Sequence, residues 1–184
     1  EVLIPEVLSS RDQFLAWSVG CASGEEAYSL AMLVDSAIRG INGKHRYGVT
    51  GTDISLPTLA RARDGIYLTR RLKDIPLHMQ QQYCVQASEK RFRIDGKLRK
   101  HVSFSQLNLR DVRMAPMMKM DLVFCQNLLI YFDRERRAQI VNDLCEFVRP
   151  GGMLVVGPGE LLGWQHSKME KVPYADTLAY RRTD

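Results

Sequence analysis

Hydrophobic positions in the first third of the chain alternate between short runs and helical spacing. The run FLAWSV at 14–19 predicts a buried strand, and apolar residues then recur every three to four positions on one face. These residues are Ala27, Leu30, Ala31, Val34 and Ile38. A helix should therefore begin near Glu25. A β-branched segment at 47–55 and a short helix at 56–65 form a second strand-then-helix unit.

The remaining chain predicts a small insertion and three more apolar strands. Asp95-Gly96 separates two alternating segments within 91–104, which is the pattern of a β-hairpin, so we expect an inserted hairpin subdomain at about 88–101. Strands follow at 102–109, 121–129 and 151–157, with a helix at 133–148 that Asp133 caps and Pro150-Gly151-Gly152 ends. Two short strands within 172–182 would add an antiparallel edge.

Strands that alternate with helices indicate an α/β fold with a doubly wound, mostly parallel sheet. The 184 residues, 45% of them hydrophobic, suit one domain over 1–184. No apolar run approaches the roughly 18 to 20 residues of a membrane span, and the acidic start is unlike a signal peptide. We therefore expect a soluble protein with no membrane insertion.

Composition narrows the chemistry only in part. The four cysteines are far apart and form no C-x-x-C pair, which favours reduced, structural thiols in a cytoplasmic protein. The four histidines show no metal-ligand spacing, so no metal is expected. A net charge of +5 suits an acidic partner, either a nucleic acid or a carboxylate-rich protein surface.

The glycine-rich segment GCASGEE at 20–26 puts two carboxylates at the start of the first helix. Glu25 and Glu26 there have two possible roles. They could stabilise the helix N-terminus through its dipole, or one of them could bind an ammonium or hydroxyl group of a nucleoside-like ligand.

Three further strand ends carry polar side chains. Asp53 is placed to accept hydrogen bonds from a ribose diol, or it could cap the following helix unless Ser55 does so instead. Asn108 and Asn127 could form ordinary turns or caps, or could read the edges of an adenine. Ligands of open α/β sheets bind at this edge, so the four ends together predict a binding site.

The ordered segments that carry these residues resemble the catalytic domain of CheR-type chemotaxis protein methyltransferases. They are WSVGCASGEEAYSLAM, GTDISLPTLARARDGIY, VSFSQLNL, DLVFCQNLLIYFDRERRAQIV and RPGGMLVVGPGE. The resemblance implies a class I, Rossmann-like fold and an S-adenosylmethionine (SAM)-dependent protein-glutamate O-methyltransferase. Such an enzyme methylates glutamates on cytoplasmic helices of methyl-accepting chemoreceptors and releases S-adenosylhomocysteine (SAH). It is expected to be a cytoplasmic monomer without metal or nucleic acid.

The resemblance also implies roles for individual residues. Glu25 would contact the methionine end of the cofactor, Asp53 the ribose hydroxyls, and Asn108 with Leu109 the adenine pocket. Gln126 and Asn127, next to Cys125, would border the methionine moiety and the methyl group. Tyr131 matches a tyrosine near the reacting centre, where we expect it to position groups, because the receptor glutamate is already ionised and needs no base.

The sequence departs from the family at three places. The family's helical N-terminal domain is not in this sequence, which we expect to be truncated relative to the family's proteins. Residues 157–160 read Gly-Pro-Gly-Glu where the family often has Gly-His-Ser-Glu. The inserted hairpin has no Gly-Gly in its loop, so we expect no tether to the pentapeptide found on some receptors.

Three other functions are weighed against the methyltransferase. A non-catalytic module that binds SAM or SAH in a chemosensory pathway is the main alternative. A nucleic-acid methyltransferase would fit the net charge, but QNLLIYF lacks the Asn/Asp-Pro-Pro-aromatic motif of many such enzymes. An NAD-dependent oxidoreductase is disfavoured because the first loop has no G-x-G-x-x-G.

Overall fold

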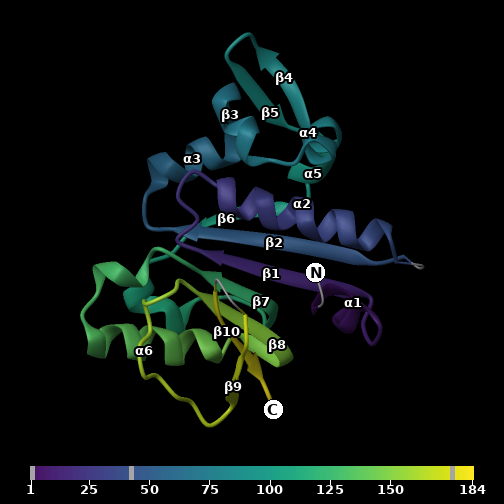
Figure 1. Cartoon of the computed structure of the whole chain (residues 1–184). Coiled ribbons are helices and arrows are strands. Elements are labelled where there is room, and N and C mark those ends of the chain that lie inside the picture. The colour runs from purple at the N-terminus through teal and green to yellow at the C-terminus, as the bar shows by residue number, and fades with distance from the viewer. Residues whose placement is uncertain (1–2, 42–43, 175–176) are drawn as a thin grey trace.

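The computed structural model describes residues 3–41, 44–174 and 177–184. Its main sheet has seven strands in the order β6-β2-β1-β7-β8-β10-β9 (Figure 1). The strands are β1 (Gln13–Val19), β2 (Arg46–Asp53), β6 (Val102–Gln106), β7 (Met120–Cys125), β8 (Val148–Val156), β9 (Met169–Val172) and β10 (Leu178–Arg182). The strands from β6 to β8 pair in parallel, while β10 is antiparallel to both β8 and β9. The predicted parallel sheet with an antiparallel edge is confirmed.

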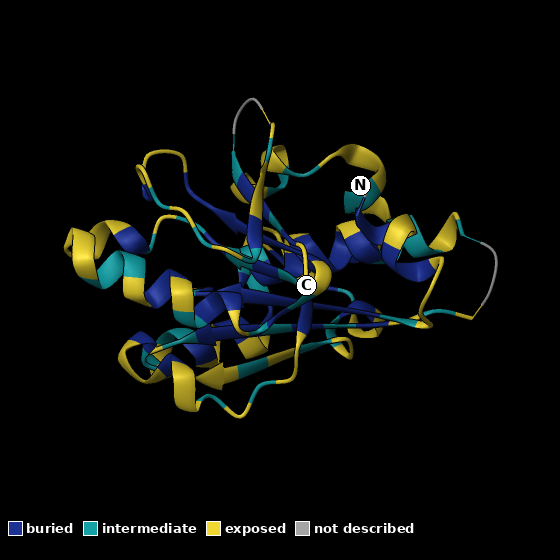
Figure 2. Cartoon of the chain, turned by 90° about the horizontal axis from the view of Figure 1, so that it is seen from below, coloured by how far each residue is buried: buried dark blue, intermediate teal, exposed yellow. Residues whose placement is uncertain are grey.

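Helices cover both faces of this sheet, as the doubly wound prediction requires. One face carries α1 (Leu3–Leu8), α2 (Glu25–Arg39) and α3 (Leu56–Asp64), and the other carries α6 (Arg134–Cys145) with the 3₁₀ segments η2 (Leu109–Met114) and η3 (Leu129–Tyr131). Buried residues follow the strands between the two layers (Figure 2). Within the described ranges, no helix is long and apolar enough to cross a membrane.

The two predicted helix starts are confirmed by their local geometry. Helix α2 begins at Glu25, and its sheet-facing residues Ala27, Leu30 and Val34 are buried. Asp133 accepts a hydrogen bond from the Arg136 amide at 2.8 Å and so caps α6.

The insertion between α3 and β6 is larger than the predicted hairpin. It contains β3 (Ile66–Leu68), η1 (Thr69–Asp74), α4 (Leu77–Tyr83), β4 (Cys84–Ser88), β5 (Arg91–Ile94) and α5 (Gly96–Arg99), with an antiparallel sheet ordered β3-β5-β4. The hairpin turn predicted at Asp95-Gly96 is wrong, because the turn lies between Ser88 and Arg91. The Asp95 carboxylate instead accepts from the Lys97 amide at 2.9 Å and starts a helical turn.

The predicted stop of the last helix is also wrong. Helix α6 ends at Cys145, and β8 is already formed at Val148, so Pro150-Gly151-Gly152 lies inside a strand. The pairing of β8 with β7 shifts register between Met120 and Leu122. Such an irregular position tolerates a proline, which has no amide hydrogen to give to a neighbouring strand.

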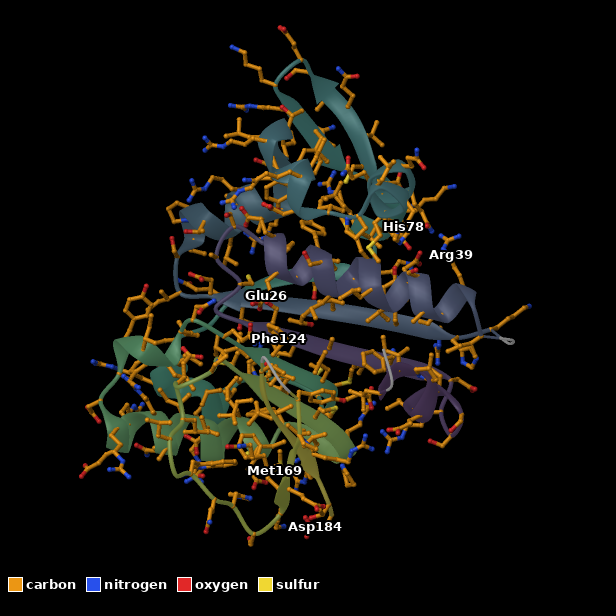
Figure 3. All side chains as sticks on the ribbon, viewed as in Figure 1. Glu26, Arg39, His78, Phe124, Met169 and Asp184 are labelled. Carbon is orange, nitrogen blue, oxygen red and sulfur yellow. The ribbon has the colours of Figure 1, made fainter. Side chains whose placement is uncertain are left out.

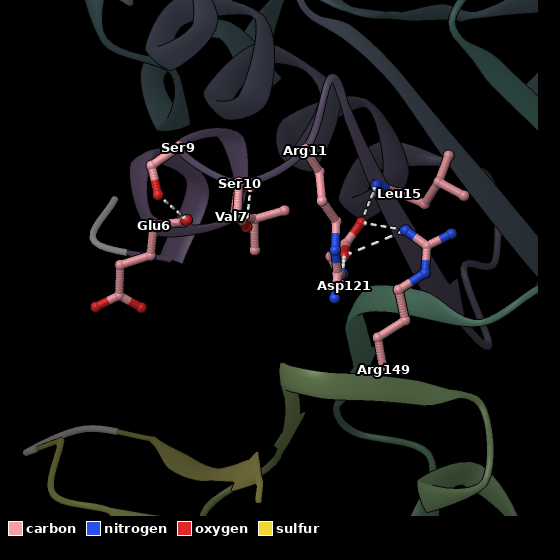
Figure 4. A network of polar contacts seen from close by, with 8 residues as sticks. All are labelled: Glu6, Val7, Ser9, Ser10, Arg11, Leu15, Asp121 and Arg149. Carbon is pink, nitrogen blue, oxygen red and sulfur yellow. Dashed lines mark hydrogen bonds and ion pairs between the residues drawn. The ribbon is translucent and has the colours of Figure 1, made fainter. Parts of the chain in front are cut away.

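A buried carboxylate joins three strands near their amino ends (Figure 4). Asp121, in β7, has no exposed surface and accepts from the Leu15 amide at 2.7 Å. It also forms ion pairs with Arg11 at 2.9 Å and Arg149 at 3.0 Å. Both of its oxygens are therefore used in holding β1, β7 and β8 together.

Candidate functional site

A hollow opens at the carboxyl ends of the strands, beside the point where strand order reverses between β1 and β7. It has a volume of about 100 Å³. Its walls come from the loops that follow β1, β2, β6 and β7. The lining residues are Val19, Gly20, Thr52, Asp53, Ile54, Leu107, Asn108, Leu109, Leu128 and Phe132. The structure thus brings together three of the predicted site residues, Asp53, Asn108 and Leu109.

Asp53 reaches this hollow with part of its hydrogen-bonding capacity unused. Its carboxylate accepts from the amides of Ala22 at 3.0 Å and Ser55 at 2.9 Å. Ser55 caps α3 through the Thr58 amide, which frees Asp53 from that role. A carboxylate can accept about four hydrogen bonds, so Asp53 can still receive a diol.

Asn108 has the capping role that the sequence allowed and also lies at the hollow. Its side-chain oxygen accepts from the Arg110 amide at 3.0 Å and caps η2, as the simpler alternative expects. The residue nevertheless lines the hollow between Leu107 and Leu109. Apolar walls with one amide are the surroundings that suit a flat, hydrogen-bonding base.

Gly20 lets the loop after β7 approach the end of β1. Its φ is +75°, and a β-carbon there would lie 2.4 Å from Cδ2 of Leu128. Leu128 and Phe132 thus narrow a hollow that is smaller than the roughly 300 to 1,000 Å³ of usual ligand pockets. A nucleoside would enter only if these two side chains moved outward.

Glu25, the predicted contact of the methionine end, does not line the hollow that Asp53 lines. Its carboxylate accepts from the Ser23 hydroxyl at 2.7 Å. The side chain lines a second hollow of about 120 Å³ between α2 and the inserted sheet, with Tyr28, Tyr67 and Arg71. The structure therefore does not bring Glu25 together with Asp53 and Asn108.

Glu26 turns toward the sheet instead (Figure 3). It accepts from the Ser18 hydroxyl of β1 at 2.6 Å, and burial raises its pKa to about 7 although that hydrogen bond acts in the opposite direction. It was not predicted from the sequence that Glu26, and not Glu25, faces the sheet. The helical period contains the signal, because Glu26 precedes the sheet-facing Leu30 by one turn, whereas Glu25 shares its face with Met32 and Ser29.

The remaining predicted residues lie on the segment that follows β7. Cys125 is buried and free, and burial together with Glu160 and Glu26 raises the pKa of its thiol. Gln126 donates to the Thr177 hydroxyl at 3.0 Å. Asn127 has a left-handed φ of 57°, and Tyr131 is 77% exposed. None of these four lines the hollow with Asp53, although Leu128 and Phe132 of the same segment do.

Taken together, the polar groups suit a nucleoside that carries a positive charge. Asp53 and Asn108 face apolar walls suited to a ribose and a base, and Glu26 offers a carboxylate at the neighbouring ends of β1 and β7. Two larger hollows of about 700 Å³ border the loop between β8 and β9, and none of the predicted site residues lines them. No group of three metal-ligating side chains gathers in the described ranges.

The model of the CheR methyltransferase SAM-binding domain matches residues 1–177.

Curated relatives show similarity over most of the chain. A chemotaxis protein methyltransferase of Borreliella burgdorferi is 32% identical over 161 residues, which cover 87% of this chain and 57% of the relative. One from Vibrio parahaemolyticus is 30% identical, with 97% of this chain and 66% of the relative covered. Chemotaxis protein methyltransferase 1 of Pseudomonas aeruginosa is 31% identical, with 97% and 67% covered. The chain thus spans about 57% to 67% of the length of these relatives.

Solved structures support the fold. The N-methyltransferase NodS of Bradyrhizobium japonicum, in complex with SAH, aligns with a TM-score of 0.53 and 15% identity over 100% of this chain and 85% of NodS. The magnesium protoporphyrin IX methyltransferase of Synechocystis, with bound SAM, aligns with a TM-score of 0.52 and 14% identity over 99% and 77%. The fold is that of class I SAM-dependent methyltransferases, as the sequence predicted.

Proposed function

Because the chain belongs to the CheR methyltransferase family and matches its SAM-binding domain, we propose that it binds SAM at the carboxyl ends of β1, β2, β6 and β7 and methylates chemoreceptor glutamates. The observation that carries the proposal is the hollow in which Asp53 and Asn108 meet apolar walls. The relatives that are named chemotaxis protein methyltransferases support the receptor as substrate.

Residues of the hollow and of the segments beside it have roles in holding the cofactor. Asp53 accepts hydrogen bonds from the ribose hydroxyls at its two unused acceptor positions. Asn108 and Leu109 border the adenine. Glu26 accepts a hydrogen bond from the ammonium group of the methionine end. The family resemblance assigned this role to Glu25. Gln126 and Asn127 border the methionine moiety from the segment after β7.

The chemistry needs few protein groups. When bound, SAM supplies a sulfonium methyl group that a carboxylate can take without a base, which leaves SAH and a glutamate methyl ester. Glutamate has a reference pKa of about 4.3 and is ionised at neutral pH. The protein has to align the two reactants and exclude water, and alignment alone is worth about 7 to 11 kcal/mol at best.

The exposure of Tyr131 supports a role toward the protein substrate rather than toward the cofactor. The residue is 77% exposed on the segment that carries Asn127. We expect its hydroxyl to orient the substrate carboxylate without gaining or losing a proton.

Charge on the inserted subdomain supports an acidic protein partner. Exposed basic residues lie on η1, β5, α5 and the residue after α5. They are Arg70, Arg71, Lys73, Arg91, Arg93, Lys97 and Lys100. Long-range attraction of this kind weakens with added salt, so salt should slow receptor methylation more than it weakens SAH binding. The protein would act as a monomer in the cytoplasm, where the receptor helices lie.

A transfer assay tests the proposal. The full-length protein is incubated with methyl-labelled SAM and the cytoplasmic fragment of a chemoreceptor from the same organism. We expect label in the receptor as a base-labile ester, and no label when receptor glutamates are replaced by alanine. SAM binding without transfer would instead support the non-catalytic module, and no SAM binding would contradict the proposal altogether.

A further inference from the structure

The segments that follow β7 and β8 are joined by one buried carboxylate, that of Glu160. Glu160 is 4% exposed and lies beyond the end of β8. Its Oε2 accepts from the Gly157 amide at 2.7 Å within its own loop and from the Asn127 amide at 3.2 Å in the segment after β7. One oxygen atom thus joins the loop after β8 to the segment whose Leu128 and Phe132 line the proposed site.

Two backbone features fit this contact. A β-carbon at residue 157 would lie 2.3 Å from Oε2 of Glu160, so glycine is required for the carboxylate to reach the amides. The backbone of Asn127 has a φ of 57°, a conformation that residues other than glycine rarely adopt. The hydrogen bond from its amide to Glu160 helps to hold this conformation.

Arg137 of α6 holds the other end of the same segment. Its guanidinium donates to the carbonyl oxygens of Phe132 at 2.7 Å, Ile130 at 3.3 Å and Glu160 at 3.4 Å. Both neighbours of Tyr131 therefore have hydrogen-bonded carbonyl oxygens, and the amide of Asn127, four positions earlier, is hydrogen-bonded as well. The segment is fixed at both ends while the side chain of Tyr131 stays exposed.

The carboxylate is not arranged for stability alone. In the described part of the chain, Oε1 of Glu160 is buried without a hydrogen-bond partner, whereas both oxygens of the buried Asp121 are used. A buried oxygen left in this way is unfavourable. An apolar residue could pack there without that cost, so the amide contacts point to a role in the placement of the loop.

We propose that Glu160 is a positioning residue for methyl transfer, which holds the segment from Gln126 to Phe132 in place by accepting the Asn127 amide while Arg137 holds its far end. The proposal rests on the proposed function, because it assigns that segment to the methyl-transfer site. Glu160 itself touches neither substrate nor reacting atoms in this arrangement.

The test uses the full-length protein with Glu160→Ala, Glu160→Gln and the exposed Glu170→Ala as control. We expect Glu160→Ala to lower kcat for receptor methylation about 100-fold, since small misplacements at a reacting centre have effects of this size. KM for the receptor should stay within about threefold, and Kd for SAH should rise by less than kcat falls, because the same segment also borders the cofactor. Glu160→Gln, which keeps an acceptor oxygen, should recover at least a tenth of the wild-type kcat. Glu170→Ala should match the wild type.

Hydrogen exchange of the unliganded protein tests, independently of activity, whether the contact of Glu160 with the Asn127 amide holds the segment. The amides of 126–132 should exchange at least about tenfold faster in Glu160→Ala than in the wild type, with no change in the strands. Unchanged exchange would overturn the proposal, as would an unchanged kcat or an effect confined to Kd for SAH. If Glu160→Ala does not fold, Glu160→Gln decides: its weaker acceptor should lower kcat and speed exchange of 126–132 measurably, and wild-type values for both would overturn the proposal. A wild type that transfers no methyl group would contradict the proposed function, while exchange would still decide whether Glu160 holds the loop.

Discussion

Carboxylates lie at both ends of the central strands, buried at the amino ends and half-buried at the carboxyl ends, and they are satisfied to different degrees. At the amino ends, Asp121 receives one amide and two guanidinium groups (Figure 4). At the carboxyl ends, Glu26 receives one hydroxyl and Asp53 two amides. The two ends share strands but differ in spare acceptor capacity. A fully used carboxylate holds a fold together, while partly used ones can bind a ligand.

Backbone conformation follows the same division. In the described part of the chain, Ala22 and Asn127 are the residues other than glycine with positive φ, and both lie in loops beyond carboxyl ends of strands. Unfavourable conformations concentrate at functional sites, where the surrounding structure holds them in place. The carboxyl end therefore differs from the amino end in both charge satisfaction and strain.

The largest effect is expected at the amino end, from Asp121→Ala. It leaves the Leu15 amide unsatisfied and two guanidinium groups without their partner, so the free energy of unfolding should fall by about 3 kcal/mol. Denaturant unfolding measures this. Asp121→Asn, which keeps an acceptor for the amide, should lose less. If Asp121→Ala lowered the free energy of unfolding by less than about 1 kcal/mol, Asp121 would not be a carboxylate that holds the fold together.

Asp53→Asn should act on binding as well as on stability. Replacing one charged acceptor of a diol should weaken SAH binding about 10-fold to 100-fold, because hydrogen bonds to charged groups contribute about 1.5 to 3 kcal/mol. Calorimetric titration gives the Kd. The free energy of unfolding should fall by at most about 1 to 3 kcal/mol, because the variant can accept from only one of the amides of Ala22 and Ser55. If affinity were unchanged while stability fell, Asp53 would belong with Asp121 as a structural carboxylate.

Glu26→Gln should affect binding and stability in opposite directions. The folded-state pKa of about 7 lies above the ordinary value of 4.5. The folded protein therefore holds this proton more tightly, and the free energy of unfolding decreases as pH rises from about 4.5 to about 7. Glutamine does not ionise, so the free energy of unfolding of the variant does not decrease over this pH range. The variant should therefore be more stable than the wild type at pH 8.

Binding should show the opposite trend for Glu26. The ionised carboxylate attracts the ammonium of the ligand, so the affinity of the wild type for SAH should rise as pH passes about 7. At pH 8 the variant should bind about tenfold more weakly. Titrations at pH 6 and pH 8 measure both effects, with Glu25→Gln as the matched control. A larger loss in the control would return the role to Glu25.

Tyr131→Phe should have the smallest effect, a few-fold decrease in kcat with unchanged stability, because the side chain is exposed. The pH profile of turnover should keep its shape, since positioning requires no proton transfer. A new steep pH dependence would show that the hydroxyl takes part in proton transfer.

Local sequence patterns predicted the sheet and helices well and the turns less well. Helical spacing placed the start of α2 at Glu25, and apolar runs located β1, β2 and β7. The hairpin at Asp95 and the helix stop at Pro150 were wrong because side-chain capping and pairing with β7 outweighed local turn preferences.

The site was predicted in part for a similar reason. Asp53, Asn108 and Leu109 meet because parallel strands end at one edge, which topology alone dictates. The choice between Glu25 and Glu26 depends on which face of α2 meets the sheet at its first turn. The contact of Glu160 with Asn127 joins residues 33 positions apart and leaves no local signal.

A crystal structure of the full-length protein with SAH tests the central claim most directly. We expect the ribose hydroxyls within hydrogen-bond distance of Asp53, the adenine beside Asn108 and Leu109, and the ammonium next to Glu26, with Leu128 and Phe132 displaced outward. SAH bound at another edge of the sheet, or bound with Asp53 and Glu26 both turned away from it, would contradict the assignment of this end of the strands as the cofactor site.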